Sequence, residues 1–163
     1  MKIAVFSDSH DHIWNMRRAI EQVSEKGIEL ILHCGDLVSP FMIDEFDSYR
    51  GKVVLIDGNN PGDQYFLAKK LADRQGKIDY QGLVARLELA GARIAAVHDP
   101  ALALDLARSG IYSAVFFGHT HLRKTERMDQ CLLHNPGALL GNKEAPSWSI
   151  FDVESGQVEE VIL

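Results

Sequence analysis

Seven side chains that can bind metal ions follow apolar runs at several places in the sequence. They are Asp8, His10, Asp36, Asn59, His98, His119 and His121. Two carboxylates, one amide and four imidazoles form a mixed oxygen and nitrogen set, which suits divalent Mn, Fe, Co, Ni or Zn and lacks the thiolates of a structural zinc site. Seven ligands are too many for one such ion. The set therefore predicts two divalent metal ions that share a bridging carboxylate.

Glycines accompany three of these ligands. Gly35, Gly58 and Gly118 each stand directly before a predicted ligand. Glycine has no Cβ, so it permits the sharp turns and the close backbone approach that a crowded rim of ligands requires. We therefore expect these three glycines to lie against the metal ligands.

In the first half of the chain, the predicted strands and helices that must position these residues alternate. Buried strands are predicted over 2–7, 29–33 and 52–56, and helices over 12–26, 40–49 and 64–74. This β-α-β-α-β order predicts a parallel sheet with right-handed crossovers. The carboxyl ends of parallel strands share one edge, where ligands bind in open α/β sheets, so the polar groups are expected to meet in one crevice.

The second half of the chain has a different pattern. It predicts a hairpin over 83–89 and 93–98, a helix over 101–108, and strands over 113–117, 123–128, 131–134, 147–153 and 158–163. Most of these strands follow one another without helices, which favours antiparallel pairing. The predicted fold class is therefore α/β, with two packed sheets and helices outside them.

Length and composition narrow the class of protein. The 163 residues suit one domain, over 1–163, and 46% apolar with 25% charged residues is typical of soluble globular proteins. No apolar run reaches the roughly 18 residues that a membrane helix needs, so no membrane partner is expected. Cys34 and Cys131 are too few for a disulfide framework, which predicts a cytoplasmic location. The sequence decides neither for nor against a homo-oligomer.

The formal net charge of −6 argues against stable binding of duplex nucleic acid, because such binding relies on Lys and Arg neutralising phosphates. A small anionic substrate stays compatible with this charge, because bound metals can reverse the local charge of a site. Neither glycine-rich nucleotide-binding motif, G-x-G-x-x-G or G-x-x-x-x-G-K-[ST], occurs in the chain, which argues against a nucleotide-binding α/β protein.

Taken in order, the ligand groups resemble the signature of the calcineurin-like metallophosphoesterases, and most closely their short bacterial and archaeal phosphodiesterases. The matching segments are Asp8-Ser9-His10, Gly35-Asp36, Gly58-Asn59, His98 and Gly118-His119-Thr120-His121. Asn135-Pro136-Gly137 also matches a turn of these small proteins, so the resemblance covers nearly the whole chain. It implies a four-layer α-β-β-α sandwich of two mixed sheets flanked by helices.

The resemblance also implies roles for the ligands. Asp8, His10 and His121 would bind one metal, Asn59, His98 and His119 the other, and Asp36 would bridge them. The candidate catalytic residues are Asp36, Asn59, His98 and Asn60. The implied reaction is hydrolysis of a small phosphate ester, preferably a diester, by in-line attack of a hydroxide that bridges two divalent metals. Mn is the first candidate for these metals, with Ni, Fe, Co or Zn as alternatives.

Two departures from the family pattern affect the leaving group. The run Gly58-Asn59-Asn60-Pro61 lacks both the His that larger enzymes place after the Asn and the acid that usually follows, and His98 is followed by Asp99-Pro100 rather than by Gly. Asn60 cannot transfer a proton near neutral pH, so Asp99 and His12 are possible substitute acids. His12 is more simply a residue at a helix start, Asp11 is expected to cap that helix, and His33 and His134 are assigned to structure.

Two alternatives stay open after this resemblance. The first is a phosphomonoesterase with the same metal centre. The second is a non-catalytic metal-binding scaffold for protein–protein interaction, because some relatives with this fold, notably the retromer scaffold subunit, have degenerate ligands. All seven ligand positions are filled here, which favours an enzyme.

Overall fold

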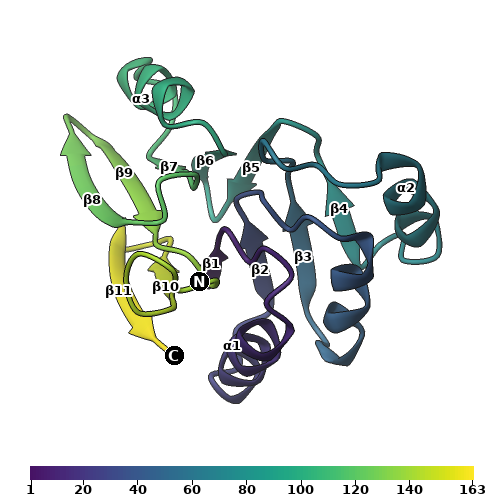
Figure 1. Cartoon of the computed structure of the whole chain (residues 1–163). Helices are drawn as coiled ribbons and strands as arrows, with labels where there is room; N and C mark the ends of the chain where they lie inside the picture. The colour runs from purple at the N-terminus through teal and green to yellow at the C-terminus, as the bar shows by residue number, and fades with distance from the viewer.

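Eleven strands and four helices make up the chain, and the computed structural model describes all 163 residues. The strands form two sheets (Figure 1). The first sheet has six strands, in spatial order β11 (Gln157–Ile162), β10 (Ser147–Asp152), β1 (Lys2–Phe6), β2 (Leu30–His33), β3 (Lys52–Leu55) and β4 (Ile78–Tyr80). The second sheet has five, in the order β5 (Val84–Leu89), β6 (Ala92–Val97), β7 (Ala114–Phe116), β9 (Cys131–Pro136) and β8 (Arg123–Met128).

Both sheets are mixed, with parallel strands flanked by antiparallel ones. Strands β1 to β4 run parallel in the first sheet, and β6, β7 and β9 run parallel in the second. Strands β10 and β11 join the first sheet beside β1 as antiparallel partners, while β5 and β8 form the antiparallel edges of the second sheet. The loops that follow β1, β2, β3, β6 and β7 are those that carry the predicted ligands.

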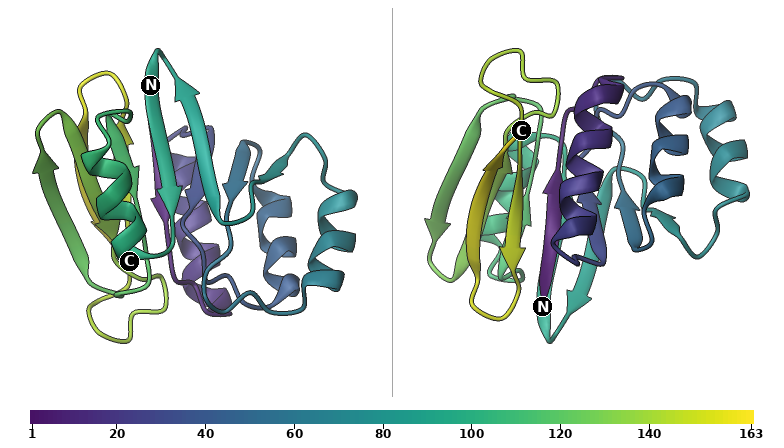
Figure 2. Two further views of the ribbon diagram at one scale, coloured as in Figure 1. Left: turned by 90° about the horizontal axis from the view of Figure 1, so that it is seen from above. Right: turned by 90° about the horizontal axis from the view of Figure 1, so that it is seen from below.

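Helices cover the outer face of each sheet. Three lie on the first sheet, namely α1 (Ile13–Glu25), the 3₁₀ helix η1 (Pro40–Ser48) and α2 (Gln64–Ala72), and α3 (Pro100–Arg108) lies on the second (Figure 2). In α1 the buried side chains Met16, Ala19, Ile20 and Val23 recur at helical spacing, so one face of the helix packs on the sheet. Ser39 caps η1, since its hydroxyl accepts a hydrogen bond from the backbone of Phe41 at 3.3 Å.

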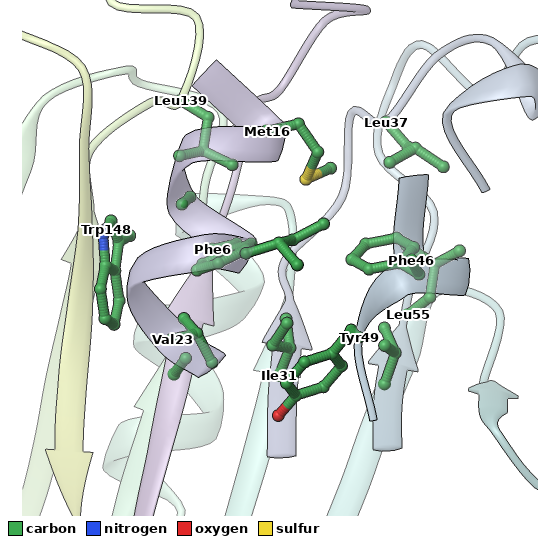
Figure 3. Packing of buried hydrophobic residues seen from close by; sticks show 14 of the residues in the cluster. Phe6, Met16, Val23, Ile31, Leu37, Phe46, Tyr49, Leu55, Leu139 and Trp148 are labelled. Atoms are coloured by element: carbon green, nitrogen blue, oxygen red, sulfur yellow. The ribbon is translucent and has the colours of Figure 1, made fainter. Parts of the chain in front are cut away.

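Three apolar cores separate the four layers. Phe6 and Trp148 point from the first sheet toward the helices and meet edge to face, with ring centroids 5.7 Å apart (Figure 3). Ile3 and Val5, which alternate with Ala4 and Phe6 along β1, point the other way into the core between the sheets, where Phe116 of the second sheet also packs. A third core joins the outer face of the second sheet to α3. The four-layer α-β-β-α sandwich is thereby confirmed.

The structure differs from the predicted elements in two respects. Strand β4, Ile78–Tyr80, was not predicted, because only Ile78 of its three residues is buried and so short a segment shows no alternation. The second half of the chain was expected to be rich in antiparallel pairs. Its strands β6, β7 and β9 instead pair in parallel, and β10 joins the first sheet as the antiparallel neighbour of β1.

Two further properties bear on the expected class of protein. Cys34 and Cys131 are buried and unpaired, in line with the absence of a disulfide framework. None of the helices combines the length and the apolar character that crossing a lipid bilayer requires.

His134 links the two sheets through hydrogen bonds at both ring nitrogens. Its Nδ1 lies 2.9 Å from the hydroxyl of Thr125 on β8, and its Nε2 lies 2.9 Å from the hydroxyl of Ser149 on β10 of the other sheet. The ring is fully buried, and this burial lowers the pKa of His134 to about 4. It is therefore a structural histidine, as the sequence predicted, and it is neutral in the folded protein above that pH.

The buried neutral state of His134 predicts a specific dependence of stability on pH. Between pH 6.5 and about 4 the unfolded chain binds a proton at His134 that the folded chain excludes, so the free energy of unfolding must fall as the pH falls through this window. The contribution of this one group reaches on the order of 3 kcal/mol. Urea unfolding of the chelator-treated protein at pH 7 and at pH 4 should show a smaller acid loss for His134→Gln than for wild type. Equal losses would contradict the prediction.

Candidate metal centre

The seven predicted ligands converge at the end of the molecule where the parallel strands of both sheets terminate. Asp36 lies at the middle of the group, because its Oδ2 is 3.3 Å from Nε2 of His10 and 3.4 Å from Nε2 of His98. These three side chains come from the loops after β2, β1 and β6, so both sheets contribute to the centre. The predicted single crevice is thus built from two sheets rather than from one sheet edge.

One set of ligand atoms surrounds a point beside Asp8. Nε2 of His121 lies 3.2 Å from Oδ1 of Asp8 and 3.2 Å from Nε2 of His10, and the His10 and Asp8 atoms are 3.8 Å apart. Ligands bound to one tetrahedral ion at about 2.1 Å lie roughly 3.4 Å from one another, which these separations match. Asp8, His10 and His121 can therefore hold one divalent ion.

A second set surrounds the amide oxygen of Asn59. This oxygen lies 3.0 Å from Nε2 of His98 and 2.7 Å from Nδ1 of His119. The same Nε2 of His98 faces Oδ2 of Asp36, which also faces His10 of the first set. Asp36 therefore occupies the boundary between the two sets, where a bridging carboxylate would have to lie.

Neighbouring groups fix which nitrogen of two histidines faces the centre. Nδ1 of His98 lies 2.8 Å from the carbonyl oxygen of Cys34, and Nδ1 of His121 lies 2.7 Å from the amide oxygen of Asn142. Both oxygens can only accept, so each Nδ1 carries the hydrogen and each Nε2 presents a lone pair to the centre. Sequence reasoning missed Asn142, because a lone Asn after Gly141 has the pattern of an ordinary turn.

Hydrogen bonds also orient the two carboxylates. Ser7 donates from its hydroxyl to Oδ2 of Asp8 at 2.6 Å, and the backbone N–H of His119 donates to both oxygens of Asp8 at 3.1 and 3.2 Å. Asn60 donates to Asp36 twice, from its backbone to Oδ1 at 2.8 Å and from its side chain to Oδ2 at 2.7 Å. The sequence proposed Asn60 as a catalytic residue, and the structure places its amide on Asp36.

The buried negative charges of the centre need cations to balance them. Asp8 and Asp36 are buried and form no ion pair with Lys or Arg, since only imidazoles face them. Burial raises the pKa of Asp36, but the hydrogen bonds from His98 and Asn60 outweigh it and hold that pKa well below its usual range. Two anionic groups out of contact with water are costly unless positive charge balances them, and two divalent ions would do so. The residues present therefore fit a dinuclear metal centre.

The same two carboxylates raise the pKa of two of the histidines. The pKa of His10 lies above its ordinary value, chiefly through its interaction with Asp8, with burial opposing and Asp36 adding to the rise. Burial lowers the pKa of His98, but its hydrogen bond with Asp36 more than compensates, so that pKa is raised as well. These two rings therefore carry part of the balancing positive charge when protons rather than metals occupy the centre.

Backbone conformations at the centre are unusual. Five of the seven predicted ligands have positive φ, namely Asp8 at 51°, His10 at 41°, Asp36 at 54°, His119 at 69° and His121 at 61°. Left-handed backbone costs a residue with a Cβ on the order of 1 kcal/mol, and such residues gather at functional sites where the surroundings enforce the conformation. The turns that project the ligands are therefore held by the packed sheets and not by local preference.

The glycines beside the ligands have the predicted role. A Cβ at Gly58 would overlap the carboxylate of Asp36, and a Cβ at Gly118 would overlap the hydroxyl of Ser7. Gly35 has φ of +94°, and a Cβ there would lie 2.7 Å from Nδ1 of His98. All three glycines thus let the backbone of one ligand loop lie directly against the side chains of another.

Other polar residues near the centre have structural tasks. His12 caps α1, since its Nδ1 accepts from the backbone of Asn15 at 3.2 Å, and Asp99 caps α3 by accepting from Leu102 at 2.8 Å. The expectation that Asp11 caps α1 is wrong, because its carboxylate instead accepts from the backbone of Ser39 at 2.7 Å. Both candidate acids, His12 and Asp99, are therefore engaged by helix starts.

His33 and Asn135 support the ligand loops from inside the fold. His33 is fully buried as predicted, with Nε2 3.1 Å from the hydroxyl of Ser9, and burial lowers its pKa to about 4. The side chain of Asn135 donates to the carbonyl of Gly118 at 2.8 Å and to the hydroxyl of Thr120 at 3.1 Å. Asn135 thus braces the loop that carries His119 and His121, a role that its Asn-Pro-Gly turn did not reveal.

Comparisons with known proteins agree with this geometry. Residues 1–156 match the calcineurin-like phosphoesterase superfamily domain. Phosphodiesterase MJ0936 of Methanocaldococcus jannaschii is 34% identical over 166 residues, which cover 100% of this chain and 99% of that protein. A solved structure of an archaeal phosphodiesterase superposes with a TM-score of 0.92 at 33% identity and covers 100% of both chains.

More distant structures share the fold. The phosphoesterase Yfce from E. coli gives a TM-score of 0.71 at 16% identity over 99% of each chain. Vps29 from Chaetomium thermophilum gives a TM-score of 0.70 at 15% identity over 100% of this chain and 94% of that one. At these identities the comparison establishes the common architecture alone.

The convergence of the ligands predicts the metal content of the protein. Two sets of ligand atoms meet at Asp36, so chelator-stripped protein loaded with Mn²⁺ should retain two ions per chain, measured by elemental analysis after removal of free metal. Protein kept in chelator provides the blank. Saturation at a single ion per chain would contradict a dinuclear centre.

Proposed function

The chain belongs to the calcineurin-like phosphoesterase superfamily, and we propose that its seven convergent residues hold the two divalent ions with which it hydrolyses phosphodiesters. It is a metal-dependent phosphoesterase that acts on a small phosphate-ester substrate. The observation that carries the assignment of residues is the position of Asp36, whose Oδ2 lies between the Nε2 atoms of His10 and His98.

The proposed division of the ligands follows the two sets of atoms. Asp8, His10 and His121 hold one ion, and Asn59, His98 and His119 hold the other. Asp36 bridges the two, since it is the one carboxylate that faces a histidine of each set at 3.3 to 3.4 Å. Mn²⁺ is the proposed metal, with Ni, Fe, Co or Zn as alternatives, because nitrogen and oxygen donors without thiolates suit these ions.

When bound, two divalent ions supply a hydroxide near neutral pH and positive charge for the phosphate oxygens. The residues of this chain contribute the geometry. Asn59 and the four histidines are neutral donors, so they hold cations without cancelling the charge that attracts an anion. Asn60 keeps the carboxylate of Asp36 in place through two hydrogen bonds. A fixed carboxylate favours attack on the substrate from one defined position.

Preference for diesters is part of the proposal. The archaeal relative of similar length is named a phosphodiesterase, and the chain has no insertion that would enclose one particular substrate. Asn59 and His119 are exposed, so the metal centre opens to solvent at the proposed second site. An open site accommodates the two ester groups of a diester.

A scaffold function has one argument in its favour, the fold shared with Vps29. Against it, all seven ligand positions are filled. In addition, Cys34 and Asn142 accept hydrogen bonds from the Nδ1 atoms of His98 and His121, which orients these two rings for metal binding. These observations favour the enzyme. The buried free thiols of Cys34 and Cys131 support our proposal that it works in a reducing compartment such as the cytoplasm.

Removing the bridging charge should separate an enzyme from a scaffold. Asp36→Asn should lower the turnover of bis-p-nitrophenyl phosphate by at least about 10²-fold, because it weakens both metal sites, and His121→Ala should weaken one. Asp63→Asn is a matched control, since Asp63 caps α2 and Asn also caps helices. It should retain wild-type turnover. Far-UV circular dichroism checks the fold of each variant, and wild-type turnover in Asp36→Asn would place the activity elsewhere.

Because no nearby side chain is free to donate a proton, the turnover rate should depend strongly on the leaving group of the substrate. Asn60 is engaged with Asp36, His12 caps α1 and Asp99 caps α3. General acid catalysis contributes about 10²- to 10⁴-fold, most strongly for basic leaving groups. Across aryl phosphodiesters of graded phenol pKa, kcat should therefore fall steeply as that pKa rises, and Asn60→His should make the fall shallower.

The same series of aryl phosphodiesters would also reveal a general acid that takes part in the reaction. A flat dependence in the wild type, with chemistry rate-limiting, would mean that an effective acid is present. If the dependence then steepens in His12→Ala, His12 is that acid, and its contact with Asn15 must open during turnover.

A further inference from the structure

The connection between β9 and β10 crosses the two loops that carry four of the predicted ligands, Asp8, His10, His119 and His121. The backbone N–H of Leu139 donates to the carbonyl of Ser7 at 3.0 Å, and that of Leu140 donates to the carbonyl of Asp8 at 3.0 Å. The side chain of Asn15 on α1 donates to the carbonyl of Leu139 at 2.7 Å. The connection thus lies along the turn after β1, at the end of the molecule where α1 begins (Figure 2).

Residues 142–144 hold the turn after β7. Asn142 accepts a hydrogen bond from Nδ1 of His121 at 2.7 Å, and Lys143 donates from its ammonium to the carbonyl of Thr120 at 2.9 Å. Glu144 accepts from the backbone N–H of Arg123 at 2.9 Å. Residues 139–144, which we call the strap, therefore bind both the turn that bears Asp8 and the turn that bears His121.

The strap bonds directly to ligands of one proposed metal site and to none of the other. Asp8, His10 and His121 are the ligands proposed for the first ion, and the strap bonds to the backbone of Asp8 and to the ring of His121. No hydrogen bond links it to Asp36, Asn59, His98 or His119. The second site is braced separately, because the ring of His98 is held by Cys34 of the first sheet.

We infer that the strap is the positioning element of the first metal site, and that Asn142 is the residue that orients His121. His121 has a left-handed backbone, with φ of 61°, and its ring is only partly buried, so local structure alone does not fix the direction of Nε2. The bond from Nδ1 to Asn142 keeps Nε2 directed at Asp8, 3.2 Å away. Such supporting bonds raise metal affinity by about 10- to 100-fold.

The inference rests on the proposed function, because it assumes that Asp8, His10 and His121 hold a metal. The test is titration of chelator-stripped protein with Mn²⁺ alone, followed by calorimetry and by the electron paramagnetic resonance signal of the coupled ion pair. For Asn142→Ala we expect one of two dissociation constants to rise about 10- to 100-fold with the other unchanged, and the coupled signal to appear only at higher Mn²⁺. His121→Ala identifies which of the two constants belongs to the first site.

Two further variants make the test specific. Asn142→Asp places a carboxylate oxygen where the amide oxygen accepts from His121, so it should restore wild-type affinity. Thr125→Val removes the corresponding bond to Nδ1 of His134, which is not a ligand, so it should lower thermal stability and leave both Mn²⁺ affinities unchanged. Asn142 is exposed, so neither of its substitutions removes a buried contact of the fold.

The outcomes separate the inference from the function it rests on. A wild-type protein that binds only one ion would contradict the dinuclear function itself. Two ions in the wild type together with unchanged affinities in Asn142→Ala would overturn the role of Asn142. An equal loss at both sites, or a failure of Asn142→Asp to restore affinity, would also overturn it, because the strap would then act on the fold as a whole.

Discussion

The arrangement of this protein depends on two carboxylates, Asp8 and Asp36, that are buried without a Lys or Arg partner. Removing two negative charges from water is costly, and the fold surrounds them with groups that reduce this cost. Ser7 and the backbone of His119 donate to one carboxylate, and Asn60 donates twice to the other. These neutral donors leave a net negative charge at the centre, which two divalent cations would balance.

Delivering two carboxylates, an amide and four imidazoles to one place requires more than one sheet edge. The first sheet supplies the loops after β1, β2 and β3, and the second supplies those after β6 and β7. The sheets pack through a common core that includes Val5, Leu32 and Phe116, so their ends meet at a fixed separation. Gly58 and Gly118 then allow the loops to pass within van der Waals contact of each other's ligands. The precision of the centre therefore derives from apolar packing far from the metals.

Most of the strands and all seven candidate ligands could be predicted from the sequence. The features that could not be predicted were missed for physical reasons. Long buried runs such as Ile94–Val97 identify strands, and the polar residues after them identify ligands, because burial and chemistry are local properties of the chain. Strand β4 was missed since its three residues depend on pairing with β3 and have little pattern of their own. The pairing of β10 with β1 could not be foreseen, because register between distant segments is decided by the whole fold. Asn142 was missed for the same reason, since its partner lies 21 residues away.

The pairing of β1 with β10 also has a consequence for how the protein is made. Lys2 lies opposite Asp152, so β1 has on one side a neighbour, β2, that follows within a few tens of residues. Its neighbour on the other side, β10, lies much further along the chain and leaves the ribosome much later. Closing so long a loop is slow, and until it closes β1 is an open strand edge. The turn that carries Asp8 is held by Leu139 and Leu140, which lie in the same late segment. The nascent chain can therefore form the β1–β2–β3 ladder early, but the turn that carries Asp8 is held in place only after the segment with Leu139 and Leu140 has been made.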